Sequence, residues 1–202
     1  PGTDVALFQA MANVIMKEKL YNTGFINSRT EGYDAYSKSL DEFTPLWAES
    51  ITGVPSVDII EAARIYANAN LAAFYWGMGI SQSVHGTDNT MSIANLALLC
   101  GHLGKAGTGL NPLRGQNNVQ GCSDTGGLPT YYPGYQSVTD NKIREKFEVK
   151  WNTSLNDKPG LTTLEMSDAA GSGLITDFLI LGENPLMSEP DLNVARHHFS
   201  NL

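Results

Sequence analysis

Two short apolar runs, each followed by a glycine-containing loop and a helical pattern, constrain the fold of this chain most strongly. The runs are residues 71–76 and 174–181, and the complete units span 71–100 and 174–199. The helices of the two units are expected at residues 88–103 and 191–199. Continuous apolar runs of this length, bounded by turn residues, are typical of strands buried on both faces of a parallel sheet. The sequence therefore predicts an α/β fold, with Rossmann-like parallel sheet layers and flanking helices.

Helical periodicity indicates further helices outside these two units. Apolar residues recur at helical spacing in residues 5–20 and in a segment that we expect Ser56 to cap. Residues 141–151, as a solvent-facing helix, and residues 161–170 are also expected to be helical. Residues 105–135 are polar and glycine-rich, and a loop of that length is unusual in a compact domain unless it has a function or contains an unrecognised helix.

The composition indicates a folded, acidic protein. Hydrophobic residues make up 42% of the chain, charged residues 17%, and the formal net charge is −8. Without clustered Lys and Arg it is a poor candidate for nucleic-acid binding. No apolar stretch reaches the ~18–20 residues of a membrane span. None of the four histidines, and neither Cys100 nor Cys122, has a partner at metal-ligand spacing, so we predict no metal ligand here.

The start of the chain at Pro1, without an initiator methionine, suggests an internal fragment of a longer protein. A localisation signal of the parent, including a periplasmic export signal, would then be missing from this piece. With no secretory signal and no disulfide framework in the sequence, we expect a cytoplasmic location.

The strongest candidate site is the segment 111–121, NPLRGQNNVQG, in which six of the eleven side chains are Asn, Gln or Arg. Its two glycines allow the backbone to approach a ligand closely. The guanidinium of Arg114, set among amides, is suited to clamp a small carboxylate or phosphate through paired N–H donors. The alternative interpretation is a solvated polar loop, and composition alone favours neither strongly.

Three other stretches are weaker candidates. Gln82, in the loop after the first apolar run, can hydrogen-bond the edge of a heterocycle, although a plain strand-to-helix turn explains it as well. Asn184 and Ser188 follow the second run, where Asn before Pro is also an ordinary turn element. Residues 2–4 precede the first helix, where a helix cap is the simpler interpretation and phosphate binding the alternative. No GxGxxG fingerprint supports a nicotinamide dinucleotide site.

The stretch NPLRGQNNVQGCSDTGGLPTYYPGYQ closely resembles the formate dehydrogenase branch of the molybdopterin oxidoreductases. PGTDVAL, SRTEGYDAY, YWGMGISQ, NLALLCGHLGKAGTG and LGENPLMSEPDL occur in the same order and at similar spacing as in that family, so the resemblance covers essentially the whole chain. RGQNNVQG is characteristic of the formate branch. The resemblance implies parts of two interleaved domains, with 1–116 and 117–202 as the first and second cofactor-binding segments.

The resemblance also implies a role for individual residues. Arg114 matches the arginine that lies beside the molybdenum and orients formate, so it is the expected catalytic residue. The remaining matched positions contact the cofactor, a bis-molybdopterin guanine dinucleotide with Mo or W, either at the pterin or at a guanine dinucleotide end: Gly2, Thr3, Asp4, Met78, Gln82, Gln116, Asn184 and Ser188.

The family's metal ligand, a Cys or selenocysteine followed by His, lies upstream of the matched segment, as do the cysteines of its [4Fe–4S] cluster. We therefore expect formate oxidation to CO2, with electron transfer, only in the full subunit, and an inactive fragment. The implied partners are formate, the remainder of the catalytic subunit and iron–sulfur electron-transfer subunits. Two alternatives stay open: a scaffold segment that keeps the fold without molybdenum, and another oxidoreductase of the same superfamily.

Overall fold

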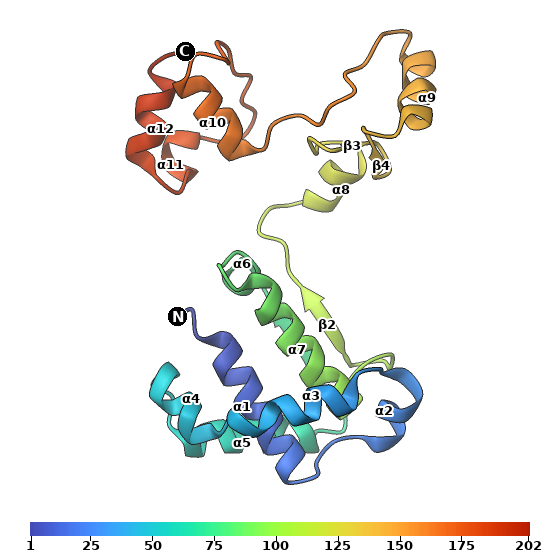
Figure 1. Cartoon of the computed structure of the whole chain (residues 1–202), viewed down its shortest axis with the longest axis vertical. Helices are drawn as coiled ribbons and strands as arrows, with labels where there is room; N and C mark the ends of the chain where they lie inside the picture. The colour runs from blue at the N-terminus through green and yellow to red at the C-terminus, as the bar shows by residue number, and fades with distance from the viewer. The chain divides into compact units, whose positions relative to one another are not determined.

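The computed structural model describes all 202 residues, which form two compact units, Pro1–Asn117 and Asn118–Leu202 (Figure 1). Each unit has its own packed elements and is described here by itself. No helix in either unit combines the length and the apolar character needed to cross a lipid bilayer.

The first unit is built around helix α1 (Asp4–Lys17), which packs against three other helices: α4 (Pro45–Thr52), α5 (Ser56–Asn68) and α7 (Gly86–Cys100). This unit contains the largest fully buried side chains of the chain: Ile15, Leu40, Ile59, Ile93 and Leu96. Smaller elements complete the unit: α2 (Thr23–Arg29), α3 (Tyr33–Ser39), the 3-10 helix η1 (Leu40–Glu42) and α6 (Met78–Ser81).

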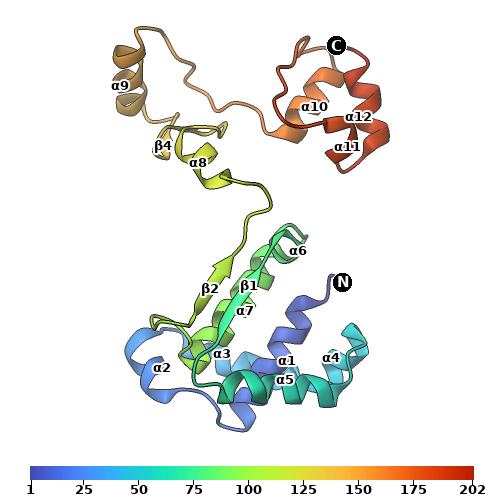
Figure 2. The same cartoon turned by 180° about the vertical axis from the view of Figure 1, so that it is seen from behind.

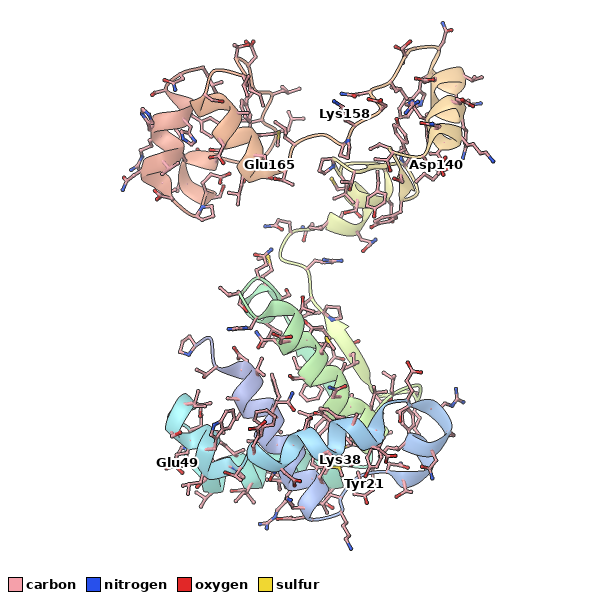
Figure 3. The ribbon with its side chains drawn as sticks, viewed as in Figure 1. Tyr21, Lys38, Glu49, Asp140, Lys158 and Glu165 are labelled. Atoms are coloured by element: carbon pink, nitrogen blue, oxygen red, sulfur yellow. The ribbon has the colours of Figure 1, made fainter.

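The helices of this unit follow the apolar periodicity of the sequence, and the helices expected at 5–20 and 88–103 are confirmed. Helix α7 stops at Gly101, whose φ of 69° is in the left-handed region that favours glycine. The expected cap at Ser56 is wrong: Pro55 occupies the cap position and Ser56 is the first helical residue. The Ser56 amide is instead satisfied by the Glu49 carboxylate at 2.9 Å, near the end of α4 (Figure 3).

Strands β1 (Ala73–Trp76) and β2 (Gly109–Pro112) form a parallel pair, with Ala73 opposite Gly109 and Trp76 opposite Pro112. This confirms the first predicted strand and the parallel α/β character of the fold. Phe74 packs against Phe8 and Tyr66 of the core. β2 lies inside the segment that looked like a long polar loop, because its sequence GLNP carries no strand pattern and pairing with β1 determines its conformation.

The second unit contains helices α8 (Val119–Asp124), α9 (Asn141–Trp151), α10 (Thr163–Gly171), α11 (Pro185–Ser188) and α12 (Leu192–Phe199), and an antiparallel pair of β3 (Tyr131–Tyr132) and β4 (Gln136–Ser137). The start of α9 is capped by Asp140, which accepts the amides of Lys142 and Ile143 (Figure 3). The start of α10 is closed by Glu165, which accepts the amide of Thr162 at 2.8 Å. The helices expected at 141–151, 161–170 and 191–199 are thereby confirmed.

The predicted second strand, residues 174–181, is wrong. The segment has no strand partner, and its side chains at Leu174, Leu179 and Leu181 are each more than four-fifths exposed. Its first amides, those of Leu174 and Ile175, donate to the carbonyl of Ala169 and so close the end of α10. A strand requires a neighbour for its hydrogen bonds, and the only strand pair in this unit is the short antiparallel one. Apolar character alone therefore does not make this segment a strand.

Candidate functional site

The candidate site lies where β1 and β2 leave their sheet. The amide of Leu113 donates to the carbonyl of Trp76 at 2.7 Å, which extends the ladder by one step beyond the Trp76–Pro112 pair. Both strands end at the same edge of the sheet, where the first is followed by α6 and the second by residues 113–117 (Figures 1 and 2). Parallel pairing thus brings together two loops that the sequence separates by some thirty residues, and ligands of open α/β sheets bind at this edge.

The two loops are in contact through Met78 and Gly115. A Cβ atom built on Gly115 would lie 2.8 Å from Met78 Cε and 3.3 Å from its sulfur. Glycine at 115 therefore allows the thioether to close over the backbone of the second loop. Among the residues predicted to bind a ligand, the structure directly shows one contact between separate loops, that of Met78 with the Arg114–Gln116 loop.

The polar side chains of the second loop have no partners within the chain. Arg114 and Gln116 are exposed, and neither makes a hydrogen bond or an ion pair with the protein. The base of the loop is fixed by Asn111, whose amide donates to the Phe74 carbonyl at 3.0 Å. A cationic guanidinium and an amide are thus held on a tethered loop with their donors available to an anionic, hydrogen-bonding ligand.

The loop after β1 is short, and contacts with α7 hold it in place. Gln82 ends α6, and its amide donates to the Met78 carbonyl at 2.7 Å. Its side chain is exposed, and a Cβ built on Gly77 or on Gly79 would meet nothing within 4 Å. Beneath the loop lies Asn89 of α7, a buried residue that the sequence analysis missed. The signal in the sequence was an amide side chain on the inner, mostly apolar face of a predicted helix.

The start of α1 lies at the same end of the first unit as α6 and the start of α7 (Figures 1 and 2). Gly2 has a φ of 81°, Thr3 occupies the cap position and Asp4 is the first helical residue. The Thr3 side chain makes no capping hydrogen bond, so the expected cap is present by position only. A contact between these three residues and a cofactor stays a prediction.

Asn184 and Ser188 belong to the second unit, and both have local partners. Asn184 caps α11 by accepting the amide of Leu186 at 3.1 Å. The Ser188 hydroxyl donates to the Glu183 carboxylate at 2.7 Å. These contacts are those of a structural turn, and the ligand role of the two residues stays a prediction.

Other reactive side chains do not form a catalytic centre in this chain. Burial raises the pKa of the Cys100 thiol to about 12, which keeps it protonated and unreactive at neutral pH. Ser167 and Asp168 both approach His198, but they approach the same nitrogen, Nδ1, at 3.4 and 3.7 Å. A serine nucleophile and its orienting carboxylate need opposite ring nitrogens. His198 packs over Gly171, and its side chain is largely covered.

Comparison with known proteins places the whole chain in one family. The family model described as "Molybdopterin oxidoreductase" matches residues 1–202. The chain is 48% identical to the F420-dependent formate dehydrogenase subunit alpha of Methanocaldococcus jannaschii and 45% identical to formate dehydrogenase H of Escherichia coli, in each case over its full length. It spans 30% and 28% of those two relatives.

A solved structure is similar to about half of the chain. Acetylene hydratase from Pelobacter acetylenicus superposes with a TM-score of 0.51 at 25% sequence identity. The similarity covers 52% of this chain and 15% of the hydratase. The chain is thus similar to proteins with different activities. Overall similarity does not decide between these activities, so a function has to be argued from the residues at the strand exits.

Proposed function

The chain belongs to the molybdopterin oxidoreductase family, and we propose that it is a segment of the catalytic subunit of a molybdopterin-dependent formate dehydrogenase. In this role it supplies loops that bind the cofactor and the arginine that binds formate. The proposal is supported by relatives named formate dehydrogenase that are 42–48% identical over the whole chain. The alternative of a scaffold segment is less favoured, because a scaffold has no use for an unpaired guanidinium among exposed amides.

The observation that carries the proposal is the exit of the β1–β2 pair. There, Met78 closes over Gly115 while the adjacent Arg114 has no partner in the protein. The donor set fits a molybdopterin cofactor: exposed amides for a heterocycle edge, a guanidinium for an anion, and open backbone at Gly77 and Gly79 for close approach. We assign Met78, Gln82 and Gln116 to cofactor binding here, and Gly2, Thr3 and Asp4 at the start of α1.

For the second unit we propose that Asn184 and Ser188 bind the other guanine dinucleotide end of a bis-molybdopterin guanine dinucleotide. Both residues already make local hydrogen bonds through Asn184 Oδ1 and the Ser188 hydroxyl. The Asn184 amide nitrogen has no partner in the chain and keeps its donors for a ligand. This assignment rests on the match of the LGENPLMS stretch to the family.

Arg114 would bind the formate carboxylate and hold its C–H bond towards the reacting centre. A guanidinium pairs with both oxygens of a carboxylate, which fixes orientation and neutralises charge without acid–base chemistry. The bound cofactor, through its Mo or W ion, supplies the redox chemistry in which formate yields carbon dioxide, a proton and two electrons. We propose that the metal ligand and a [4Fe–4S] cluster lie in other parts of the subunit, and that iron–sulfur subunits accept the electrons.

The two cysteines of this chain are free, which fits the reducing cytoplasm that we propose as its location. The 202 residues alone are expected to be inactive, because they do not contain the Cys or selenocysteine followed by His that supplies the family's metal ligand.

The proposal is tested on the complete catalytic subunit that contains this chain. Metal and pterin analysis should give about one Mo or W ion and a pterin for each subunit, and formate should reduce an artificial dye acceptor. A subunit without metal or pterin would support the scaffold alternative. A subunit that carries metal and pterin but leaves formate unchanged would belong to another oxidoreductase of the family.

A further inference from the structure

Asn89 is an unusual residue for its position in α7. It lies in the first part of the helix, near the apolar core residues Ile93 and Leu96, and only 2% of its surface is exposed. Asparagine is an unfavourable residue inside a helix, and a buried amide is costly unless its hydrogen bonds are made. An asparagine is therefore expected at this buried position only if its side-chain amide has hydrogen-bond partners there.

The loop after β1 provides these partners. The Asn89 side-chain nitrogen donates to the Ile80 carbonyl at 3.0 Å and to the Ser83 hydroxyl at 3.1 Å, which uses both of its protons. Beside it, Gly86 approaches the loop so closely that a Cβ there would lie 2.0 Å from the Ser81 carbonyl oxygen. The loop is therefore fastened to the start of α7 by a buried amide and a close backbone contact.

The loop needs this support to keep its shape. Helix α6 has four residues, Met78–Ser81, and a single helical turn is not stable in isolation. Met78 and Gln82 lie at its two ends and are exposed, whereas Asn89 holds the turn from the buried side. The two hydrogen bonds of Asn89, together with the close contact at Gly86, therefore fix the turn that carries Met78 and Gln82.

We propose that Asn89 is a positioning residue for the cofactor: it holds residues 78–83 in the shape that binds one dinucleotide end of the molybdopterin. This inference rests on the proposed function and extends it to a residue that does not touch the ligand. Asn89 acts through Met78 and Gln82. Its removal loosens the loop and speeds cofactor loss, because changes in affinity appear mainly in the dissociation rate.

The test uses the complete subunit and a matched control within the same unit. Asn13 is also a buried helical asparagine, 4% exposed, and its amide donates to the Leu40 carbonyl at 2.7 Å. Asn89→Leu and Asn13→Leu therefore remove the same chemical group from similarly buried positions, one beneath the loop and one in α1 where it contacts η1. Ser83→Ala removes one of the two hydrogen bonds of Asn89 through a change at an exposed position. It replaces Asn89→Leu in the test if that variant does not fold.

The first measurement is the rate at which pterin leaves the purified subunit, monitored through the fluorescence of the oxidised pterin. The second is hydrogen–deuterium exchange in residues 78–86 without cofactor, and the thermal midpoint of each variant is recorded as well. Losing two hydrogen bonds should raise the release rate about tenfold in Asn89→Leu, with faster exchange in the loop. Ser83→Ala should show a smaller increase in the same direction. Asn13→Leu should lower the thermal midpoint and leave both loop measurements at their wild-type values.

Equal release rates in Asn89→Leu and Asn13→Leu would overturn the inference, because the effect would then be one of general stability. Unchanged exchange in residues 78–86 of Asn89→Leu, or of Ser83→Ala where that variant replaces it, would also overturn it. A wild-type subunit that carries no pterin is a different result: it refutes the proposed function itself, and the inference with it.

Discussion

Met78 lies against Gly115, so close that a Cβ on the glycine would be 2.8 Å from the methionine Cε atom. This contact joins the loop after β1 to the loop after β2, and it places the amide-rich segment of Arg114 beside the turn that ends at Gln82. Four of the predicted ligand-binding residues thus come from two adjacent strand exits of the first unit.

Gly115→Ala should displace Met78. Because the clash is with the end of a flexible side chain, the chain should lose little stability, about 1 kcal/mol or less, while the complete subunit should retain less pterin. The measurement is the pterin content after purification, together with the thermal midpoint.

Gly24→Ala is the control for Gly115→Ala, because its new Cβ would meet only Asn22 Oδ1, at an ordinary 3.6 Å. The double variant Met78→Ala/Gly115→Ala removes the clash but also the thioether. Wild-type pterin retention in Gly115→Ala would contradict a role of the Met78–Gly115 contact in binding.

The core of the first unit should respond strongly to a cavity at Leu96. This side chain is completely buried between α7 and α1, and Leu→Ala changes at such sites cost about 2–5 kcal/mol. Urea unfolding of Leu96→Ala should show this loss, whereas Val84→Ala, at a side chain that is 98% exposed, should not. Equal midpoints for the two variants would mean that Leu96 is not in the core.

Residues 174–181 should behave as exposed apolar surface in the isolated chain. Leu179 is 87% exposed, so Leu179→Lys should reduce the binding of an apolar fluorescent dye without lowering the thermal midpoint. Ala195, which is 1% exposed in α12, gives the contrast: Ala195→Lys should unfold this part of the chain. A large stability loss in Leu179→Lys would show that the segment is packed in the chain.

Stability should fall in acid partly through Glu49. Hydrogen bonds from the Ser56 hydroxyl and amide lower the pKa of the Glu49 carboxyl below its ordinary value. A lowered pKa in the folded state contributes stability above the unfolded pKa of about 4.3, and this contribution is lost as the pH falls through the folded pKa. Thermal midpoints of the wild type and Glu49→Gln, measured between pH 7 and pH 3, should therefore converge as the pH falls below the unfolded pKa.

Glu61→Gln is the control, since Glu61 is an exposed carboxylate of α5 with no hydrogen bond in the chain. A difference between wild type and Glu49→Gln that stays constant over the whole pH range would contradict the assigned Glu49–Ser56 interaction.

The sequence predicts those features that depend on local periodicity or on the rule for parallel strands. Helices α1 and α7 follow directly from their apolar spacing. Parallel pairing of β1 was expected, but its partner is β2 and not residues 174–181, so the proximity of Met78 to the Arg114 loop could not be predicted from the two apolar runs. Strand β2 could not be predicted, because GLNP acquires its conformation from a neighbour that is distant in sequence.

The error at residues 174–181 has the same origin. An apolar run becomes a strand only when another strand accepts its hydrogen bonds, and sequence alone does not show whether that partner is present. Asn89 was missed for a related reason: its importance depends on the carbonyl of Ile80, whose position is known only once the loop is built.

The kinetic role of Arg114 tests the central claim most directly. In the complete subunit, Arg114→Ala should lower kcat/KM for formate about 10- to 100-fold, because hydrogen bonds to a charged partner contribute more than neutral ones. Arg29→Ala removes another exposed, unpaired arginine of the first unit and should leave formate oxidation unchanged. If Arg114→Ala retains wild-type turnover and the wild-type KM for formate, then Arg114 does not bind the substrate and the account is wrong.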